Sequence, residues 1–197
     1  MRFFFFIISL LFSIVTNAQE NFDVRTYGNK EAIKIYLFTS LACPHCAQFH
    51  QDVLPEIQNR YLKTQKAQLV VVDLSMNRAN LMGATLLRCL PKDQVPVVEK
   101  QLYEHQKKWC YDEKDAYSYL SQLAQENGLD AGNFESCIRN KDIQKNLLST
   151  QEKLSERYGV SRMPTLLIRR GKKVGLWEGA DKKEIVDGLD EFLDLHH

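Results

Sequence analysis

Two cysteines three residues apart are the side chains in this sequence best placed to do chemistry. The stretch "TSLACPHCAQFH", residues 39–50, places Cys43 and Cys46 around Pro44 and His45, directly after an apolar run. Such a pair can bind a metal, form a structural crosslink, or exchange disulfide bonds with other thiols. The elements that position the pair decide among these three uses.

The local pattern places Cys43 where a strand ends and a helix begins. Residues 32–40 are apolar and rich in β-branched and aromatic residues, as in a buried strand. Residues 43–64 show apolar positions at helical spacing, and Pro55 predicts a kink within them. Pro44 then occupies the first helical position, where its missing N–H costs nothing. The sulfur of Cys43 therefore lies at the positive end of a helix dipole, near unpaired backbone N–H groups.

This placement predicts a stabilised thiolate on Cys43. A protonated His45 adds positive charge, and thiols in such settings have a pKa of roughly 3.5–7.5 instead of about 8.5. A stabilised thiolate is also a good leaving group from a mixed disulfide, so the pair should oxidise other thiols readily. Cys46, which we expect inside the helix and more buried than Cys43, is the expected resolving thiol.

The other two uses of the pair have less support in the sequence. A metal site needs two further ligands, of which His50, four residues after Cys46, could supply one. A disulfide between Cys43 and Cys46 that served only as a crosslink would close a very short loop and stabilise little. For His50 we expect packing or hydrogen bonding near the pair and not a chemical role.

The N-terminus has the layout of a secretory signal peptide. One positive charge, Arg2, precedes the apolar residues 3–15, and a small-residue site ends at Ala18. Thirteen helical residues rise only about 20 Å, which is short of a bilayer core of roughly 30 Å. We therefore expect residues 1–18 to be removed by cleavage after Ala18, and the mature chain to be exported.

The mature chain, residues 19–197, has a balanced charge. Without Arg2 the 26 basic residues fall to 25, which equals the 25 acidic residues. This balance gives no reason to expect binding to nucleic acid or to an acidic membrane. All five cysteines lie in the mature part, where an exported protein meets an oxidising environment.

Three segments at the start of the mature chain predict a βαβ unit. Residues 67–75 form a second apolar, β-rich run like residues 32–40, and the helical residues 43–64 lie between the two. A strand, a helix and a strand at this spacing favour a parallel pair of strands. The first part of an α/β domain would therefore span residues 19–76.

The rest of the chain predicts a helical insert followed by the second part of the α/β domain. Residues 77–156 carry apolar residues at helical spacing and no convincing strand. Residues 157–197 return to the α/β domain, with two strands within 165–179 and an amphipathic helix over 181–195. The large aromatic residues of the insert are expected in its core and not in a ligand site: Tyr103, Trp109, Tyr117 and Phe134.

A second chemical signal lies far from the cysteines, at Met163-Pro164. Proline cannot occupy a central strand ladder, so Pro164 marks a turn or a cis peptide bond where the next strand begins. A cis-proline loop beside the CxxC helix would leave backbone groups free to pair with an extended substrate. Taken alone, these residues predict only an ordinary trans turn.

The two motifs together resemble those of the DsbA-like thiol–disulfide oxidoreductases. "FTSLACPHCAQFH" and "YGVSRMPTLLI" occur at the separation found in that family, with helices between them. The family consists of thioredoxin-fold proteins of the bacterial cell envelope. The resemblance covers essentially the whole mature chain and implies an α/β thioredoxin fold with an inserted all-helical domain.

The resemblance also implies a role for each residue of the two motifs. Cys43 would be the attacking thiolate, Cys46 the resolving thiol and His45 the group that stabilises the thiolate, with Pro44 completing the active motif. Pro164 would be the cis-proline that faces the pair at the substrate site, and Met163 would lie beside it, close to the active sulfurs.

Two positions depart from the family pattern. Many relatives carry a buried glutamate six residues before the first cysteine, and this chain has Leu37 there, so the proton route from Cys46 lacks its usual acid. The residue before the expected cis-proline is Met163, where valine or threonine is more usual. That difference bears on the choice of substrates and partners.

The remaining cysteines, Cys89, Cys110 and Cys137, fall in the helical insert. "LLRCLPKDQ" and "NFESCIRN" resemble places where some branches of the family carry a structural disulfide, which implies the pair Cys89–Cys137. This bond would enclose 47 residues and stabilise the fold by roughly 4 kcal/mol. The sequence leaves pairings of Cys110 with either cysteine open; unpaired, Cys110 is expected as a small buried apolar residue.

These features predict an exported dithiol oxidase that introduces disulfide bonds into secreted or periplasmic proteins through the Cys43–Cys46 pair. The dithiol is itself the redox centre, so no organic cofactor and no metal is expected. The substrates would be reduced or unfolded exported proteins, and the resemblance implies a quinone-linked membrane protein that reoxidises the pair. A monomer is expected because residues 19–30 are too few for a dimerisation segment.

Three alternatives from other classes remain open. The first is a disulfide isomerase or reductase of the same fold. The second is a copper-handling thioredoxin-like protein of the envelope that uses the thiols as soft ligands. The third is a binding module whose CxxC is inert.

Overall fold

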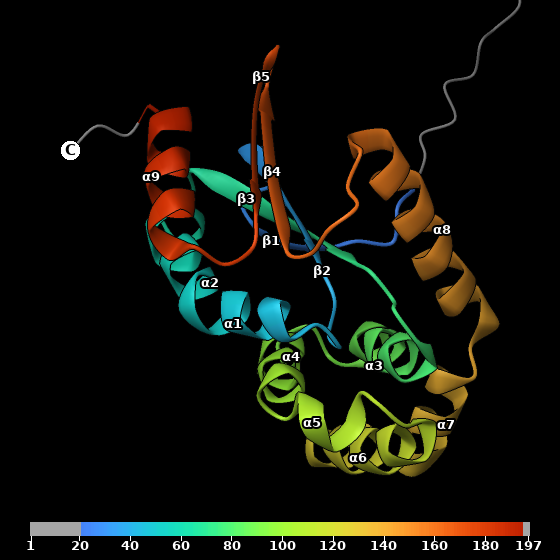
Figure 1. Ribbon diagram of the computed structural model, residues 1–197. Coiled ribbons are helices and arrows are strands. Elements are labelled where there is room, and N and C mark those ends of the chain that lie inside the picture. The colour runs from blue at the N-terminus through green and yellow to red at the C-terminus, as the bar shows by residue number, and fades with distance from the viewer. Residues whose placement is uncertain (1–20, 195–197) are drawn as a thin grey trace, which may run out of the picture.

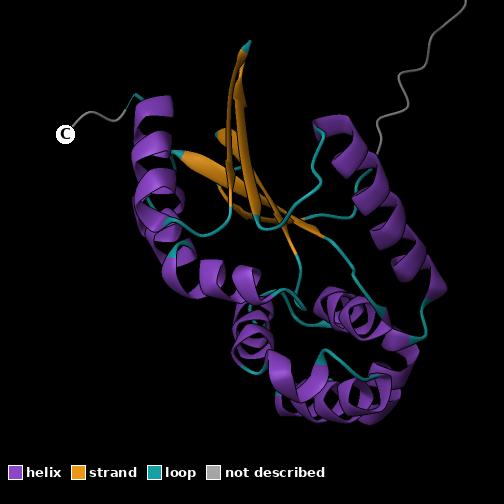
Figure 2. Cartoon of the chain, in the orientation of Figure 1, coloured by secondary structure: helices purple, strands orange, loops and turns teal. Residues whose placement is uncertain are grey.

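Five strands form one mixed sheet in a computed structural model that describes residues 21–194. The predicted signal peptide, residues 1–18, lies outside the described residues. The sheet order is β1-β3-β2-β4-β5. The strands are β1 (Arg25–Gly28), β2 (Ile33–Thr39), β3 (Ala67–Asp73), β4 (Thr165–Arg170) and β5 (Lys173–Glu178). Figure 1 shows the order of the elements, and Figure 2 separates helices from strands.

The helices fall into three groups along the chain. After β2 come α1 (Pro44–Asp52), α2 (Leu54–Ile57) and the π-helical turn η1 (Gln58–Leu62). The insert between β3 and α8 contains α3 (Arg78–Cys89), α4 (Val95–Glu104), α5 (Gln106–Trp109), α6 (Glu113–Glu126) and α7 (Ala131–Ile138). The long α8 (Lys141–Tyr158) returns the chain to the sheet, and α9 (Lys182–Phe192) ends the described part.

The pairing of the central strands confirms the predicted βαβ unit. β2 and β3 are parallel, and β4 and β5 form an antiparallel hairpin that joins the sheet through β2. Gly171 stands in the turn of that hairpin with a φ of +62°, as a tight turn requires. The N-terminal strand β1, which pairs antiparallel with β3, was not predicted because four residues give too short a pattern.

The helix that follows β2 is broken, and the break lies two residues before the predicted kink. α1 ends at Asp52, and α2 begins at Leu54 after Val53. Pro55 has no N–H to donate to the carbonyl four residues earlier, so the regular helix cannot continue through this turn. The break leaves α1 as a short helix whose first turn carries the active motif.

Each face of the sheet is covered by a different set of helices (Figure 1). On one face α1, α2 and α9 pack against β2, β3 and β4 through an apolar core that includes Phe49, Ile57 and Leu189. On the other face α8 covers the sheet through Leu154, which packs with Phe38 and Val72. Both faces of β2 and β3 are therefore buried, as their nearly continuous apolar runs predict.

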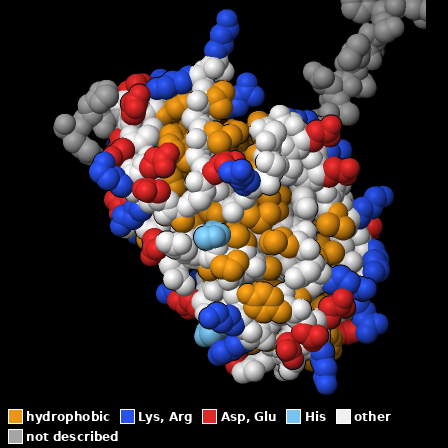
Figure 3. Space-filling view, viewed as in Figure 1, with side chains coloured by type: hydrophobic (Ala, Val, Ile, Leu, Met, Phe, Trp, Pro, Cys, Tyr) orange, Lys and Arg blue, Asp and Glu red, His pale blue; other side chains and the backbone are white. Residues whose placement is uncertain are grey.

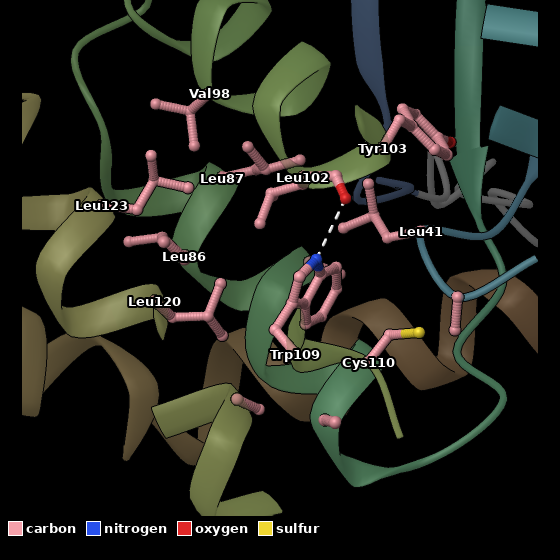
Figure 4. Close-up of a cluster of buried hydrophobic side chains, with 14 of the residues drawn as sticks. Leu41, Leu86, Leu87, Val98, Leu102, Tyr103, Trp109, Cys110, Leu120 and Leu123 are labelled. Atoms are coloured by element: carbon pink, nitrogen blue, oxygen red, sulfur yellow. Dashed lines mark hydrogen bonds between the residues drawn. The ribbon is translucent and has the colours of Figure 1, made fainter. Parts of the chain in front are cut away.

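The insert has its own core, and this core extends to α1. Trp109 lies at its centre and donates its indole N–H to the carbonyl of Leu102 at 3.0 Å (Figure 4). The side chain of Leu41, from the loop before α1, points into the same cluster. The cluster also contains Cys43 and Cys46. The active motif thus lies at the seam between the insert and the sheet.

The aromatic residues of the insert follow the prediction with one exception. Tyr103, Trp109 and Phe134 are buried core residues, as expected. Tyr117 is 45% exposed, so its prediction as a core residue is wrong. Its ring packs edge-on against Phe134 while its hydroxyl reaches outward to Glu135 at 3.0 Å. A tyrosine at the margin of a helical stripe can keep its polar end in water in this way.

The predicted fold class, an α/β domain interrupted by a helical block, is confirmed by this order of elements. Within residues 21–194 no helix combines the length and the apolar character that a membrane crossing requires.

Candidate active site

The predicted position of Cys43 at the start of a helix is the position that the structure gives it. The backbone of Cys43 is extended and forms the N-cap of α1, and Pro44 occupies the first helical position. The backbone N–H of Cys43 donates to the carbonyl of Ser40 at 3.1 Å, which fixes the turn between β2 and the helix. Pro44 and His45 are exposed on the first turn.

The surroundings of Cys43 stabilise its thiolate. The Cys46 N–H donates to the Cys43 sulfur at 3.4 Å. A hydrogen bond from the Cys46 thiol, backbone N–H groups of Cys46 and His45, and the charge of His45 lower the pKa of Cys43 from 9.0 to about 6, against the opposing effect of burial. At neutral pH this sulfur is therefore mostly thiolate, as its place at the helix start predicts.

Cys46 has the opposite character. Its hydrogen bond to Cys43 and its burial raise its pKa well above the usual range for a thiol. It is 1% exposed, whereas Cys43 is 7% exposed, so an incoming sulfur meets Cys43 first. The backbone N–H of Ser40 donates to the Cys46 sulfur at 3.4 Å. The two sulfurs thus differ in both charge and access, which is what an attacking and a resolving thiol require.

The predicted proline loop lies against the cysteine pair, although Met163 comes 120 positions after Cys43 in the sequence. The Met163–Pro164 peptide bond is cis. The carbonyl oxygen of Met163 lies 3.8 Å from the Cys43 sulfur. The carbonyl of Pro164 accepts from the Gly179 N–H at 2.8 Å, which ties the loop to the end of β5. The structure therefore brings Cys43, Met163 and Pro164 together.

A glutamine of the insert also holds the active loop, and the sequence analysis did not identify it. The amide nitrogen of Gln106, at the start of α5, donates to the carbonyl of Leu41 at 2.8 Å and to the carbonyl of Cys43 at 2.9 Å. Gln106 is itself buried. No local pattern marks such a residue, because its partners lie more than 60 residues away in the chain.

Behind Cys46 lies a cavity of about 520 Å³ between α1, α4 and the sheet. The hydroxyls of Thr39 and Tyr103 are 2.8 Å apart on its wall. The imidazole of His50 packs against the ring of Tyr103 in a tilted arrangement with ring centres 4.5 Å apart, in agreement with its predicted packing role. Leu37, which stands where the family pattern has a glutamate, also lines this cavity.

Glu99, which lines the cavity, belongs to a buried network of charges. The guanidinium of Arg25 contacts Asp73 and Glu99, each at 2.7 Å. Arg88 contacts Asp73 at 2.6 Å and Asp23 at 2.8 Å. Burial alone would raise the pKa of Asp73, but the two guanidinium groups lower it to about 2. This network joins β1, β3, α3 and α4, and so fixes the insert on the sheet.

The three remaining cysteines lie apart from this site. Cys89 and Cys137 form a disulfide that joins α3 to α7, which is the pairing implied by the family resemblance. Cys110 is a free thiol with 0% exposure, in agreement with the expectation of a small buried apolar residue. Within residues 21–194, no group of three or more His, Cys, Asp or Glu side chains could hold a metal ion.

The surface above the cysteine pair is apolar. Hydrophobic side chains gather in the middle of the face shown in Figure 3, over the region where α1 begins. Charged side chains lie mainly around the margin of this face. An extended, partly unfolded chain with exposed apolar side chains could lie across such a surface.

Comparisons with known proteins agree with this architecture. A family model described as Thioredoxin matches residues 20–194. The structure is similar to the crystal structure of Wolbachia pipientis alpha-DsbA1, with a TM-score of 0.78 and 20% identity over 87% of this chain and 92% of that one. A protein-disulfide isomerase from Novosphingobium aromaticivorans gives a TM-score of 0.70 at 17% identity, over 85% of this chain and 97% of that one.

A similar sequence belongs to a longer protein. A Rickettsia conorii protein named "Putative protein-disulfide oxidoreductase RC0029" is 30% identical over 118 residues, which are 59% of this chain and 42% of that protein. The present chain therefore matches less than half the length of this relative.

Proposed function

Because the chain belongs to the thioredoxin family and has a DsbA-like fold, we propose that it is an exported thiol–disulfide oxidoreductase that acts as a dithiol oxidase. It would introduce disulfide bonds into secreted or periplasmic proteins through the Cys43–Cys46 pair. The observation that carries this proposal is the contrast between the two sulfurs, one a stabilised thiolate at a helix start and the other a buried thiol.

The reaction is a sequence of two thiol–disulfide exchanges. A substrate thiolate attacks the Cys43 sulfur of the oxidised pair, a new bond joins the two sulfurs, and the Cys43–Cys46 bond breaks with its electron pair on Cys46. A second substrate thiolate then attacks the substrate sulfur of the mixed disulfide. Cys43 leaves as a thiolate, the substrate gains a disulfide bond, and the protein is left with two reduced cysteines.

The direction of the reaction follows from the thiolate on Cys43. A group that stabilises the thiolate stabilises the reduced form of the protein, which makes the disulfide form a stronger oxidant. The low pKa of Cys43 also makes it a good leaving group in the second exchange. The carbonyl of Met163, beside the Cys43 sulfur, is placed to pair with the backbone of an extended substrate.

Partners and location extend the proposal. The substrates would be reduced or unfolded proteins in the periplasm, reached after removal of the signal peptide at Ala18. A quinone-linked membrane protein would reoxidise the pair. The dithiol itself carries the electrons, so the reaction as written needs no bound organic cofactor. The protein would act as a monomer.

A second candidate is a disulfide isomerase or reductase of the same fold. This candidate is supported by the similarity to a solved protein named as a protein-disulfide isomerase. Both activities can use the same fold and the same CxxC site. The two candidate activities differ in the redox state in which the Cys43–Cys46 pair is kept. An isomerase needs reduced Cys43, whereas an oxidase needs the disulfide.

A redox titration distinguishes the two candidates. The protein is equilibrated with reduced and oxidised glutathione, and the state of Cys43 and Cys46 is read by alkylation and mass spectrometry. We expect the pair to stay reduced until the buffer is strongly oxidising. A pair that is already oxidised in reducing glutathione buffer would contradict the oxidase proposal. Cys110→Ser is the matched control, because Cys110 is buried in the insert, and it should leave the midpoint unchanged.

A further inference from the structure

We propose that His50 exchanges the proton of Cys46 through the cavity between α1 and α4, a role that rests on the proposed function and deepens it. Cys46 must take up a proton when it leaves the disulfide and must lose one when it attacks a mixed disulfide. Its sulfur is buried, so this proton cannot pass directly to bulk water. A proton-exchange group must therefore lie within reach of the cavity behind it.

The cavity connects Cys46 to His50. Both side chains line it, and its volume of about 520 Å³ is enough for several water molecules. The hydroxyls of Thr39 and Tyr103 lie on the wall and can pass hydrogen bonds along it. Leu37, on the same wall, has no group that can take a proton.

The other ionisable groups around the cavity are engaged or unsuitable. From α4, Glu99 contacts Arg25 at 2.7 Å, and Lys100 contacts Glu104 at 3.7 Å. From β1, Tyr27 donates to Glu99 at 3.3 Å, and burial raises its pKa to about 12.

The phenol of Tyr103 is also unsuitable, because burial raises its pKa well above the usual range. Burial lowers the pKa of His50. The nearby carboxylates raise this pKa and the nearby basic groups lower it, and the net effect is a lowered pKa. A neutral imidazole is therefore available at neutral pH to accept a proton.

The position of His50 also allows its ring to exchange protons with bulk water. Its ring packs against Tyr103 with the ring planes tilted by 33°, and the residue is only half-buried, so it can return a proton to bulk water. Its ring nitrogens have no hydrogen-bond partner among the protein groups of residues 21–194 that the structure describes. An imidazole that is fixed in place but not committed to a partner is well suited to proton exchange.

The proton moves in opposite directions in the two halves of the cycle. When substrate attacks Cys43, the electron pair of the broken bond goes to Cys46, and His50 passes a proton from bulk water to the Cys46 sulfur through cavity water. During reoxidation neutral His50 accepts the proton of the Cys46 thiol. The Cys46 thiolate then attacks Cys43 in the mixed disulfide, and the thiolate of the oxidising partner leaves.

The test follows the two phases of the reaction between the reduced protein and an aromatic disulfide that releases a coloured thiolate. The first phase reports attack by Cys43, and the second reports attack by Cys46. In His50→Gln we expect the second phase to slow about tenfold or more at neutral pH, since general base catalysis typically contributes at least this much. The first phase should remain close to that of the wild type.

The pH profile separates a proton-exchange role from a structural one. The second phase of the wild type should level off above the pKa of His50, because the neutral imidazole is then fully available. In His50→Gln the rate should keep rising with pH, because only solvent base remains. In His50→Ala, added imidazole should restore the second phase in proportion to its concentration.

A matched histidine provides the control. The ring of His105 hydrogen-bonds to the Gln101 carbonyl and to Tyr119 within the insert, outside the cavity, so His105→Gln should leave both phases unchanged. An unchanged second phase in His50→Gln, or a His50→Ala protein that imidazole does not accelerate, would overturn the role of His50. A missing first phase in the wild type would instead overturn the proposed function.

Discussion

Cys43 stands at the beginning of a helix, whereas Cys89 and Cys137 stand near the ends of two others. Cys43 caps the N-terminus of α1, where backbone N–H groups and the helix dipole favour a negative charge. Cys89 is the last residue of α3, and Cys137 is the second-last residue of α7, where the carbonyl ends disfavour a thiolate. These helix positions therefore predict a reactive bond in the first region and an inert bond in the second.

The two pairs also differ in what they connect. Cys43 and Cys46 are separated by two residues, so their disulfide constrains almost nothing in the unfolded chain. The Cys89–Cys137 bond spans 48 positions and joins α3 to α7 within the insert. This difference supports the proposed redox role of the first pair, and it predicts that the second pair mainly stabilises the fold.

The largest expected effect is the loss of exchange when Cys43 is replaced. Cys43→Ser cannot form a mixed disulfide, because a serine hydroxyl forms no bond to sulfur under these conditions, so the oxidation of a reduced peptide should fall to background. The rate is measured from the disappearance of the peptide thiols. The Cys89→Ala/Cys137→Ala protein is the comparison. If that double variant lost exchange to the same extent while still folded, the division between the pairs would be wrong.

Removing the insert disulfide should mainly reduce stability. For Cys89→Ala/Cys137→Ala, the loss of the closed loop predicts a free energy of unfolding lower by about 4 kcal/mol, measured by urea denaturation. The pKa of Cys43 should stay near 6, because the disulfide joins α3 to α7 and is not attached to α1. A shift of that pKa toward 9 in the folded variant would mean that the two regions are coupled.

A smaller effect is expected where the insert holds the active loop. Gln106→Leu leaves the carbonyls of Leu41 and Cys43 without their buried donor, which should cost about 1–3 kcal/mol of stability. Urea denaturation measures this loss. The exposed Gln125, on α6, gives the matched control, since Gln125→Leu should change stability by less than about 0.5 kcal/mol. Equal losses for the two variants would reject the clamping role of Gln106.

The smallest expected effect concerns the exposed histidine of the motif. His45→Gln removes a positive charge near Cys43 but keeps the helix start and the backbone N–H groups, so the pKa of Cys43 should rise by about one unit or less. The pH dependence of the thiolate absorbance gives this value. Gln48, exposed on the same helix, is the control position. A rise of several units would show that His45 acts more strongly than the helix start.

The sequence was sufficient for the parts of the site that depend on neighbouring residues. The place of Cys43 at a helix start follows from an apolar strand pattern, a proline at the first helical position and the periodicity of the next residues. The loop at Pro164 followed from proline chemistry together with family resemblance. Both signals are local, and local backbone preferences largely determine them.

The missed features depend on contacts across the chain. Arg25 is an ordinary basic residue in the sequence, and only the fold places it between Asp73 and Glu99. The same holds for Gln106, and for Tyr103, which was expected only as a core residue and also borders the cavity behind Cys46. Tyr117 was misplaced because helical spacing alone cannot tell the centre of an apolar stripe from its edge.

The most direct test of the central claim is the ionisation of Cys43 in the reduced protein. The thiolate absorbance of the Cys110→Ser variant is followed against pH. Replacing Cys110 leaves Cys43 and Cys46 as the free thiols that contribute to the signal. The account predicts that one thiolate is half-formed near pH 6, that exchange by Cys43 slows about tenfold for each pH unit below this value, and that Cys46 does not ionise in the same range. A single transition near pH 9 for both sulfurs would contradict the account.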